Sequence, residues 1–151
     1  MLILFILDTG ICPREALKLR QENFDLGSLE VTVPQGVAKT RKKRTLPLSL
    51  FVAREVKRLL ALRPLEWQEA PVFCDFEGKP LSVQAFSWRL RKYSREIGYP
   101  VTPYDLRHSF TILSLRNGGN VFALQRTLGH TDLTMTKRYL ALTGGGSSPG
   151  A

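Results

Sequence analysis

Apolar residues recur along most of the chain at the spacing of helices that bury one face. The chain opens with a short apolar run, residues 1–7, which predicts a buried helix ended by Thr9 and Gly10. In residues 83–97 the apolar positions lie three and four apart and form one stripe along a helix. Further helices are expected at residues 13–21, 50–63, 104–116, 121–129 and 131–142. Most of these helices begin beside a Pro, Ser, Thr or Asn that suits a helix N-terminus.

A different pattern occupies residues 29–49. Residues 29–34 alternate between apolar and polar side chains, as a half-buried strand does. Residues 45–49 are the expected partner strand, and residues 34–44 then form the tip of a hairpin. The sequence therefore predicts a mainly α fold with a small antiparallel β-hairpin or sheet, in the α+β class. Residues 144–151 are rich in Gly and Ser and predict a flexible tail.

The charge of the chain points to a polyanionic partner. Among 151 residues there are 22 Lys and Arg against 13 Asp and Glu, a net charge of +9, which favours nucleic acid as the partner. Two groups of cations are expected to contact a phosphate backbone, because one sits on a rigid hairpin tip and the other on a helix face. They are Lys39, Arg41, Lys42, Lys43 and Arg44 at the tip, and Arg89, Arg91, Lys92 and Arg95 on residues 83–97.

Other classes of protein fit the sequence poorly. The apolar opening is far shorter than the roughly 20 residues of a membrane span, and it lacks the features of a signal peptide. Cys12 and Cys74 form neither a zinc motif nor a disulfide framework. We therefore expect no cysteine zinc site, no membrane span and a reducing, intracellular location.

Two motifs in the C-terminal third carry candidate chemistry. "TPYDLRHSF" places Arg107 on a helix, and "LGHTDLTMTKRY" places Tyr139 nine residues after His130. Taken singly, these residues could be a surface charge, a helix cap and an aromatic on an apolar face. Taken together, they resemble the signature of the tyrosine recombinases, the phage integrase family. Upstream, "AKTRKKRTLPL" and "DTGICPREALKLRQENFDL" resemble two further segments of that family, so the resemblance extends over residues 4–142.

The resemblance implies a tyrosine recombinase catalytic-domain fold over residues 1–143 and a reaction that cleaves and rejoins DNA strands through a 3′-phosphotyrosine. By residue, Tyr139 would be the nucleophile and Arg107 would clamp a non-bridging phosphate oxygen. Lys39 would protonate the leaving 5′-oxygen, and His130 would donate a hydrogen bond to the phosphate. Neither ATP nor a metal is needed, because the protein–DNA ester keeps the bond energy. The resemblance thus implies no metal, no cofactor, no membrane and no small-molecule substrate.

The resemblance also implies partners and a setting. Double-stranded DNA is the expected substrate, and a full-length protein would act with other recombinase subunits in a synaptic tetramer. The family's work is DNA recombination and integration, often for mobile elements, which suggests a prokaryotic cytoplasm with nucleoid or phage DNA. Compared with the family, the chain is expected to lack the first part of its N-terminal helix and the DNA-clamp domain before it.

Two positions depart from the family's motif. Cys12 stands where the first catalytic arginine is expected, and Tyr104 stands where the first histidine is expected. A phenol still donates a hydrogen bond, whereas a thiol cannot form a bidentate phosphate contact. Loss of a clamping arginine can cost roughly 10³–10⁵ in rate. Arg14 is rotated by roughly 200° from position 12 if both are helical, so it is not expected to compensate. The sequence thus predicts a degenerate active site and impaired or lost cleavage.

Three alternatives stay open at this stage. The first is a DNA-binding module of the same fold that does not cut its substrate. The second is a helix-turn-helix regulator built on residues 120–139. The third is a thiolate nucleophile at Cys12, because a helix N-terminus can lower the pKa of a thiol.

Overall fold

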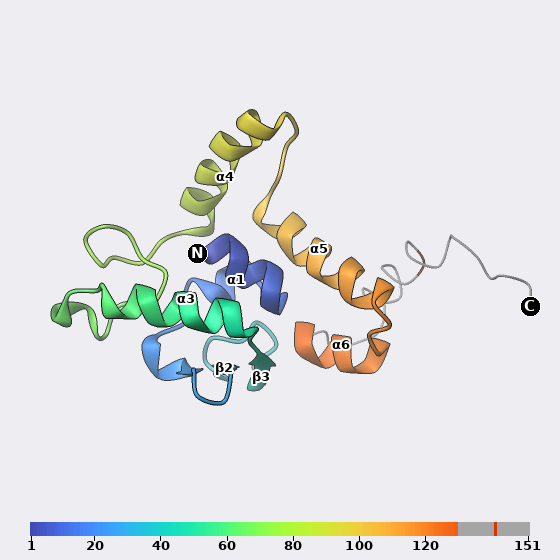
Figure 1. Cartoon of the computed structure of the whole chain (residues 1–151), viewed down its shortest axis with the longest axis horizontal. Coiled ribbons are helices and arrows are strands. Elements are labelled where there is room, and N and C mark those ends of the chain that lie inside the picture. Colours follow the sequence, from blue (N-terminus) through green and yellow to red (C-terminus); the bar gives the residue numbers. More distant parts are fainter. Residues whose placement is uncertain (130–140, 142–151) are drawn as a thin grey trace, which may run out of the picture.

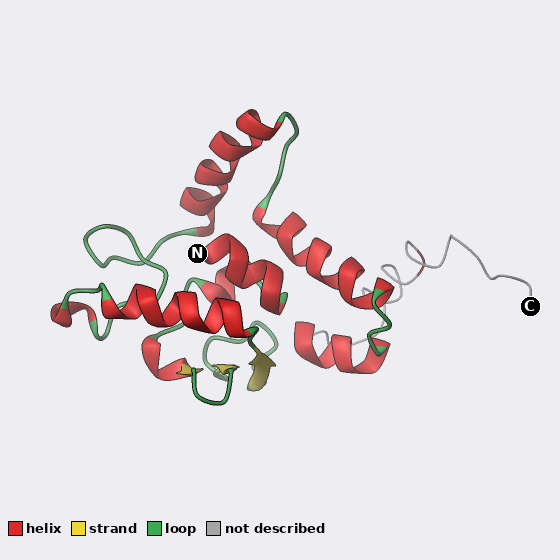
Figure 2. Ribbon diagram, in the orientation of Figure 1, coloured by secondary structure: helices red, strands yellow, loops and turns green. Residues whose placement is uncertain are grey.

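The computed structural model describes residues 1–129 and residue 141, and these residues form a helix-rich fold around a small sheet (Figures 1 and 2). Its α-helices are α1 (Leu2–Thr9), α2 (Pro13–Ala16), α3 (Leu50–Ala61), α4 (Val83–Ile97), α5 (Pro103–Arg116) and α6 (Val121–Leu128). Its strands are β1 (Phe24–Asp25), β2 (Glu30–Val33) and β3 (Arg44–Pro47), and two 3₁₀ turns span Gln21–Asn23 and Leu65–Trp67. The mainly α prediction with a small antiparallel sheet is confirmed.

Helix α1 lies at the centre of the fold, between α3 and α5 (Figure 1). This place fits its sequence, since Phe5 and Ile6 are fully buried. The Phe5 ring packs against Phe24 at 5.6 Å and Phe73 at 5.1 Å between ring centroids, which joins the helix to the sheet and to the segment after α3. The apolar opening of the chain is therefore a core helix, as predicted. No helix in the described part of the chain is long and apolar enough to cross a membrane.

The sheet is antiparallel in the order β1-β2-β3. Strands β2 and β3 pair with Val31 opposite Leu46 and Thr32 opposite Thr45, which confirms the predicted hairpin. The alternation seen in the sequence puts Val31, Val33 and Leu46 on the buried face. Strand β1 is an addition that the sequence analysis did not predict, because its two residues are too short for a periodic pattern.

Four helices begin where the sequence placed a capping residue. At each start a side-chain oxygen accepts a hydrogen bond from a backbone N–H of the first turn, which satisfies a donor that the helix itself leaves unpaired. The capping residues are Ser49, Ser82, Thr102 and Asn120. The helix expected at 131–142 and the tail at 144–151 lie outside the described residues, apart from residue 141.

The helix expected over residues 13–21 is wrong beyond its first turn, since α2 ends at Ala16. The following segment is drawn into pairing with a distant part of the chain. The carbonyl of Leu19 accepts a hydrogen bond of 2.8 Å from the N–H of Val72. The backbones of Arg20 and Pro71 form an isolated antiparallel β-bridge. This long-range pairing replaces the hydrogen bonds that a continued helix would have made.

Gly10 ends α1 at the point where α5 crosses it. Its φ is +67°, in the left-handed region that favours glycine. A Cβ atom at this position would overlap the ring of Phe110 on α5. The close contact between the two helices therefore depends on the absence of a side chain at position 10.

We expect Gly10→Ala to destabilise the fold more than Gly98→Ala does. Gly98 also has a positive φ, of +87°, but open space around it, so its substitution should cost about 1–2 kcal/mol through backbone strain alone. At position 10 the displaced Phe110 ring should add about 1–3 kcal/mol. Urea unfolding of both variants measures the difference, with Gly36→Ala as a control that has neither constraint. Equal losses for Gly10→Ala and Gly98→Ala would contradict the packing argument.

Candidate active site

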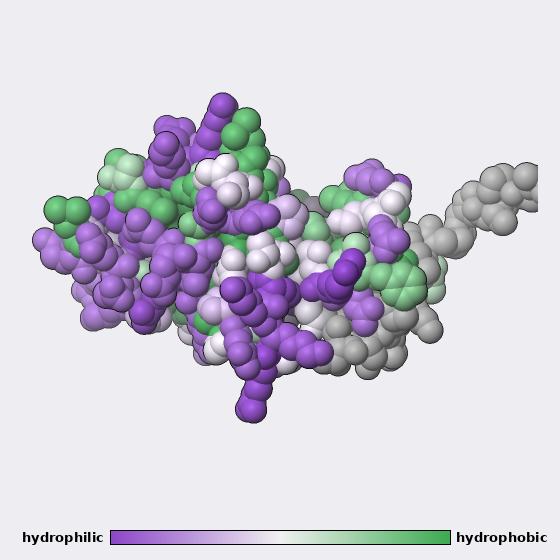
Figure 3. Space-filling model, turned by 90° about the horizontal axis from the view of Figure 1, so that it is seen from below, coloured by the Kyte–Doolittle hydropathy of each residue, from purple (hydrophilic) through white to green (hydrophobic). Residues whose placement is uncertain are grey.

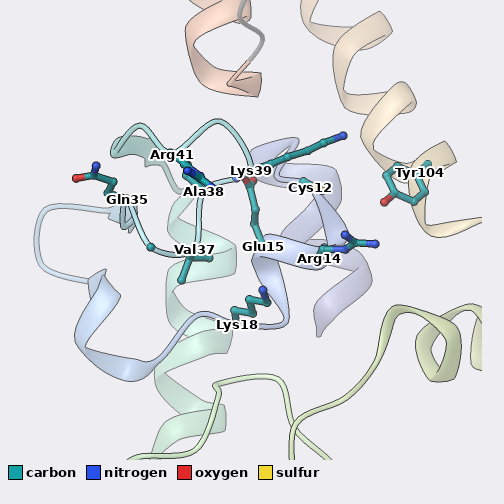
Figure 4. Close-up of a pocket in the computed structure, with 11 residues that line it drawn as sticks. Cys12, Arg14, Glu15, Lys18, Gln35, Val37, Ala38, Lys39, Arg41 and Tyr104 are labelled. Atoms are coloured by element: carbon teal, nitrogen blue, oxygen red, sulfur yellow. The ribbon is translucent and has the colours of Figure 1, made fainter.

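A pocket of about 640 Å³ opens where the start of α2, the hairpin tip and the start of α5 meet (Figure 4). Four of its lining residues are basic, and the one acidic residue among them, Glu15, is paired with Arg44. The charged and candidate residues around it are Cys12, Arg14, Glu15, Lys18, Lys39, Arg41 and Tyr104. Segments far apart in sequence thus bring Cys12, Lys39 and Tyr104 together.

Cys12 forms the inner wall of this pocket and is only 5% exposed. It is the N-cap residue of α2, with an extended backbone (φ −60°, ψ 131°), and Pro13 is the first helical residue. Its thiol is close enough to the Arg107 guanidinium to act on the pKa of that group. The two positions that the resemblance assigns to phosphate-clamping arginines are therefore neighbours in space.

Arg107 reaches this point from α5 and is also attached to the end of α6. Its Nη2 donates a hydrogen bond of 2.6 Å to the carbonyl of Leu128. Burial lowers the pKa of Arg107 below its ordinary value, although Cys12 and Glu15 act in the opposite direction. The guanidinium stays protonated, because arginine keeps its proton in proteins. The result is a fixed positive charge beside Cys12, although Arg107 does not itself line the pocket.

Glu15 and Arg44 form a buried, bidentate ion pair beneath the pocket. The distances are 2.6 Å from Nη2 to Oε2 and 3.1 Å from Nη1 to Oε1, and the side chains of Glu15 and Arg44 are 4% and 9% exposed. Glu15 Oε1 also accepts a hydrogen bond of 2.9 Å from the backbone N–H of Lys39. Burial alone would raise the pKa of Glu15, but these bonds and the charges of Arg44 and Arg107 together lower it. The pair fixes the base of the hairpin to α2.

The structure separates Arg44 from the other cations of the hairpin tip. Its Nε donates a hydrogen bond of 2.8 Å to the carbonyl of Thr127, and its other nitrogens bind Glu15. The expectation that Arg44 is a surface residue ready to contact DNA is therefore wrong, because its donors are already used inside the protein. The members of the run that remain exposed are Lys39, Arg41, Lys42 and Lys43. Hydrophilic side chains cover much of the molecule when it is viewed from the sheet side (Figure 3).

Two basic residues of α4, Arg89 and Arg91, lie on different sides of the helix. Arg91 lines a hollow with Trp88 and Tyr104, and Tyr104 also lines the pocket that holds Cys12. Arg89 lies on another side, with its guanidinium 5.9 Å from the centre of the Phe76 ring. Two positions on a helix differ by about 200°, so this separation is expected. Lys92 is exposed, and it lines neither the hollow that contains Arg91 nor the one that contains Arg89 and Phe76.

Of the remaining predicted site residues, the structure describes Tyr104 but not His130 or Tyr139. Tyr104 is 44% exposed and reaches the pocket from the first turn of α5. His130 and Tyr139 lie outside the described residues, as does the second helix of the helix-turn-helix alternative. Within residues 1–129, no cluster of three or more His, Cys, Asp or Glu side chains is arranged to hold a metal ion.

Sequence reasoning misses the roles of two residues. In the sequence Glu15 is only one member of a family segment, although a lone carboxylate among buried positions is a signal of a buried ion pair. Helical rotation predicts Arg14 on the opposite face from position 12, yet it lines the same pocket. The direction of Arg14 depends on where α2 begins, whereas the role of Glu15 depends on its distant partner Arg44.

Comparisons with known proteins agree with this geometry. The profile of the Phage integrase family matches residues 1–144, and the chain belongs to this family, the tyrosine recombinases. Tyrosine recombinase XerA of Thermococcus kodakarensis is 30% identical over 144 residues, which cover 95% of this chain and 50% of the relative. Tyrosine recombinase XerD of Lacticaseibacillus casei is 33% identical over 141 residues, which cover 89% of this chain and 47% of the relative. The chain thus spans about half the length of these curated relatives.

Solved structures share the fold. The crystal structure of XerA recombinase superposes with a TM-score of 0.79 at 24% identity, covering 91% of this chain and 51% of that one. The XerH site-specific recombinase bound to palindromic difH substrate, in a post-cleavage complex, gives 0.77 at 25% identity, covering 95% and 42%. The predicted family and its catalytic-domain fold are confirmed.

Glu15→Gln should be strongly destabilising, because it leaves the Arg44 charge buried without its partner. The expected loss is about 3–5 kcal/mol at neutral pH. Since folding lowers the pKa of Glu15, its stabilising effect is present above the ordinary value of 4.5 and is lost as pH falls through the lower folded value. The difference in the free energy of unfolding between the original chain and the variant, here called the gap, should therefore become smaller below that pH. Urea unfolding across the acid range measures this gap.

The exposed pair of Arg20 and Glu69 supplies the control. Its atoms are 3.3 Å apart, but the side chains are 51% and 88% exposed, so Glu69→Gln should change stability by less than about 1 kcal/mol. If Glu15→Gln is as mild as Glu69→Gln, the buried pair does not hold the hairpin to α2.

Proposed function

We propose that this chain is the DNA-acting domain of a tyrosine recombinase, with a strand-cleavage step that is impaired or lost because Cys12 stands in place of a catalytic arginine. One observation carries the proposal. A single pocket with four basic lining residues contains Cys12, Lys39 and Tyr104, and the charge of Arg107 lies close to Cys12. Their proximity supports the roles that the family resemblance assigns to these positions, as groups acting on one phosphate.

The charge of the pocket supports duplex DNA as the substrate. Arg14, Lys18, Lys39 and Arg41 face it, whereas the charge of Glu15 is neutralised by Arg44. Such a surface attracts a phosphodiester backbone without regard to sequence. Among the structural neighbours, XerH was solved on difH substrate, and the integrase of transposon Tn1549 was solved with circular intermediate DNA.

The family reaction assigns a task to each residue. The phenol of Tyr139 loses its proton to solvent, and its oxygen attacks the phosphorus to form the 3′-phosphotyrosine. The bond to the 5′-oxygen breaks, and that oxygen takes a proton from Lys39, which solvent then reprotonates. Arg107 and His130 stabilise the negative charge that develops on the phosphate oxygens. Attack by a 5′-hydroxyl on the phosphotyrosine reverses the step and releases Tyr139.

Cys12 weakens this arrangement at the transition state. A neutral thiol offers one weak donor, whereas an arginine offers a charged fork that binds two oxygens. Removal of one well-placed donor typically costs about 10²–10³ in rate. The phenol of Tyr104 keeps one hydrogen-bond donor where the family has a histidine, so we assign the larger loss to position 12.

A second candidate function is DNA binding without cleavage. The observation in its favour is that the Arg107 guanidinium already donates a hydrogen bond to the Leu128 carbonyl. Part of its donor set is therefore engaged inside the protein. Under either function, we propose that the domain acts on DNA in a prokaryotic cytoplasm and works with other recombinase subunits.

Binding to a short duplex of mixed sequence should weaken steeply as salt rises. If the pocket and hairpin tip contact several phosphates, the logarithm of the binding constant should fall linearly with the logarithm of salt concentration, with a slope of about −0.9 per phosphate. Fluorescence anisotropy of a labelled duplex between about 50 and 200 mM salt measures the slope. Binding that is insensitive to salt would contradict both candidate functions.

Cys12→Arg should raise covalent strand cleavage by about 10²–10³ if Cys12 limits the reaction. The substrate is a nicked duplex carrying the sequence that the protein selects from a randomised library, and the readout is the covalent protein–DNA adduct on a denaturing gel. Tyr139→Phe in the same background is the control and should abolish the adduct. Adduct formation at the same rate in the original chain and in the Cys12→Arg variant would show that position 12 does not limit cleavage.

A further inference from the structure

Arg14 occupies a place that its sequence position does not suggest. On one continuous helix, residues 12 and 14 would be about 200° apart and would face opposite sides. Helix α2, however, begins at Pro13, and Cys12 has an extended backbone. The helical rotation therefore does not apply between the two residues, and both line the same pocket. Figure 4 shows the Arg14 side chain extending toward the side where Tyr104 lies.

Among residues 1–129 the guanidinium of Arg14 has no partner, which leaves it available for a ligand. Its side chain is exposed, and within residues 1–129 no hydrogen bond or ion pair engages it. Arg44 and Arg107 differ in this respect, because Arg44 binds Glu15 and the Thr127 carbonyl, and Arg107 binds the Leu128 carbonyl. Arg14 therefore brings an uncommitted planar fork of five N–H donors to the pocket.

We propose that Arg14 makes the cationic phosphate contact that the side chain at position 12 cannot make. The assignment rests on the proposed function, since it takes the DNA phosphate as the ligand. Two residues of chain span at most about 7 Å, and a long arginine side chain can offset much of such a displacement. Arg14 thus restores the charge that Cys12 removes, but from a different starting point on the backbone.

This assignment separates binding from chemistry. A phosphate contact depends chiefly on charge and survives a shift in its origin, whereas transition-state stabilisation depends on donors placed to within a fraction of an ångström. Arg14 therefore sustains DNA affinity while the cleavage step stays slow. Once an arginine stands at position 12, the contribution of Arg14 becomes redundant.

A cycle of variants in the whole chain tests the assignment. Arg14→Ala, Arg14→Lys and Arg54→Ala are each made with Cys12 and with Cys12→Arg, and anisotropy of a labelled duplex of mixed sequence is measured across salt concentrations. Arg54 is the matched control, because it is an exposed arginine on α3 that lines none of the pockets described above. Thermal unfolding of each variant checks that the fold is retained.

With Cys12, Arg14→Ala should weaken binding roughly tenfold or more at low salt, and it should reduce the magnitude of the salt slope by about 0.9. Arg14→Lys should keep the slope, and Arg54→Ala should change little. With Cys12→Arg, the effect of Arg14→Ala should shrink to that of Arg54→Ala.

The failures are distinguishable. If the original chain shows no salt-dependent binding, the proposed function is wrong and the assignment of Arg14 is wrong with it. If the chain binds but Arg14→Ala behaves like Arg54→Ala, only the assignment is wrong. It is also wrong if Arg14→Ala is as damaging with Cys12→Arg as with Cys12, because Arg14 then does not stand in for position 12.

Discussion

The buried ion pair between Glu15 and Arg44 is the constraint around which the rest of the site is arranged. A charge removed from water is tolerated only with a close partner of opposite sign, so α2 and β3 must meet at this point. The same carboxylate holds the backbone of Lys39, and Cys12 lies one turn before it on the chain. One interaction therefore sets the positions of two residues of the pocket, although neither member of the pair needs to touch a substrate.

The end of α6 is tied into the same network through its backbone. The last carbonyls of a helix lack partners and carry partial negative charge, and here the carbonyls of Thr127 and Leu128 accept hydrogen bonds from Arg44 and Arg107. Gly129 follows with φ +73°, and a Cβ there would lie 3.2 Å from Arg44 Cζ. Two arginines thus fix the point from which the chain leaves α6 toward the sequence that contains His130 and Tyr139.

The sequence predicted most of the features whose causes are local. The helix starts at Ser49, Ser82, Thr102 and Asn120 and the hairpin pairing follow from neighbouring residues, and the structure agrees with them. The early end of α2 and the burial of Arg44 depend on distant partners, which a pattern of charge and hydrophobicity cannot identify. The resemblance to the family indicated which residues share a site. The direction of the Arg14 side chain could not be predicted, because it depends on where α2 begins.

The lack of a side chain at Gly10 also affects the distance between Cys12 and Arg107. Gly10 lies two residues before Cys12, and Phe110, which it contacts, lies three residues after Arg107 on the same helix. The contact between Gly10 and Phe110 therefore sets the distance between Cys12 and Arg107. Any side chain at position 10 would widen that spacing while leaving every residue of the pocket in place in the sequence. The geometry of this site thus depends partly on the lack of a side chain at Gly10, a residue that carries no functional group of its own.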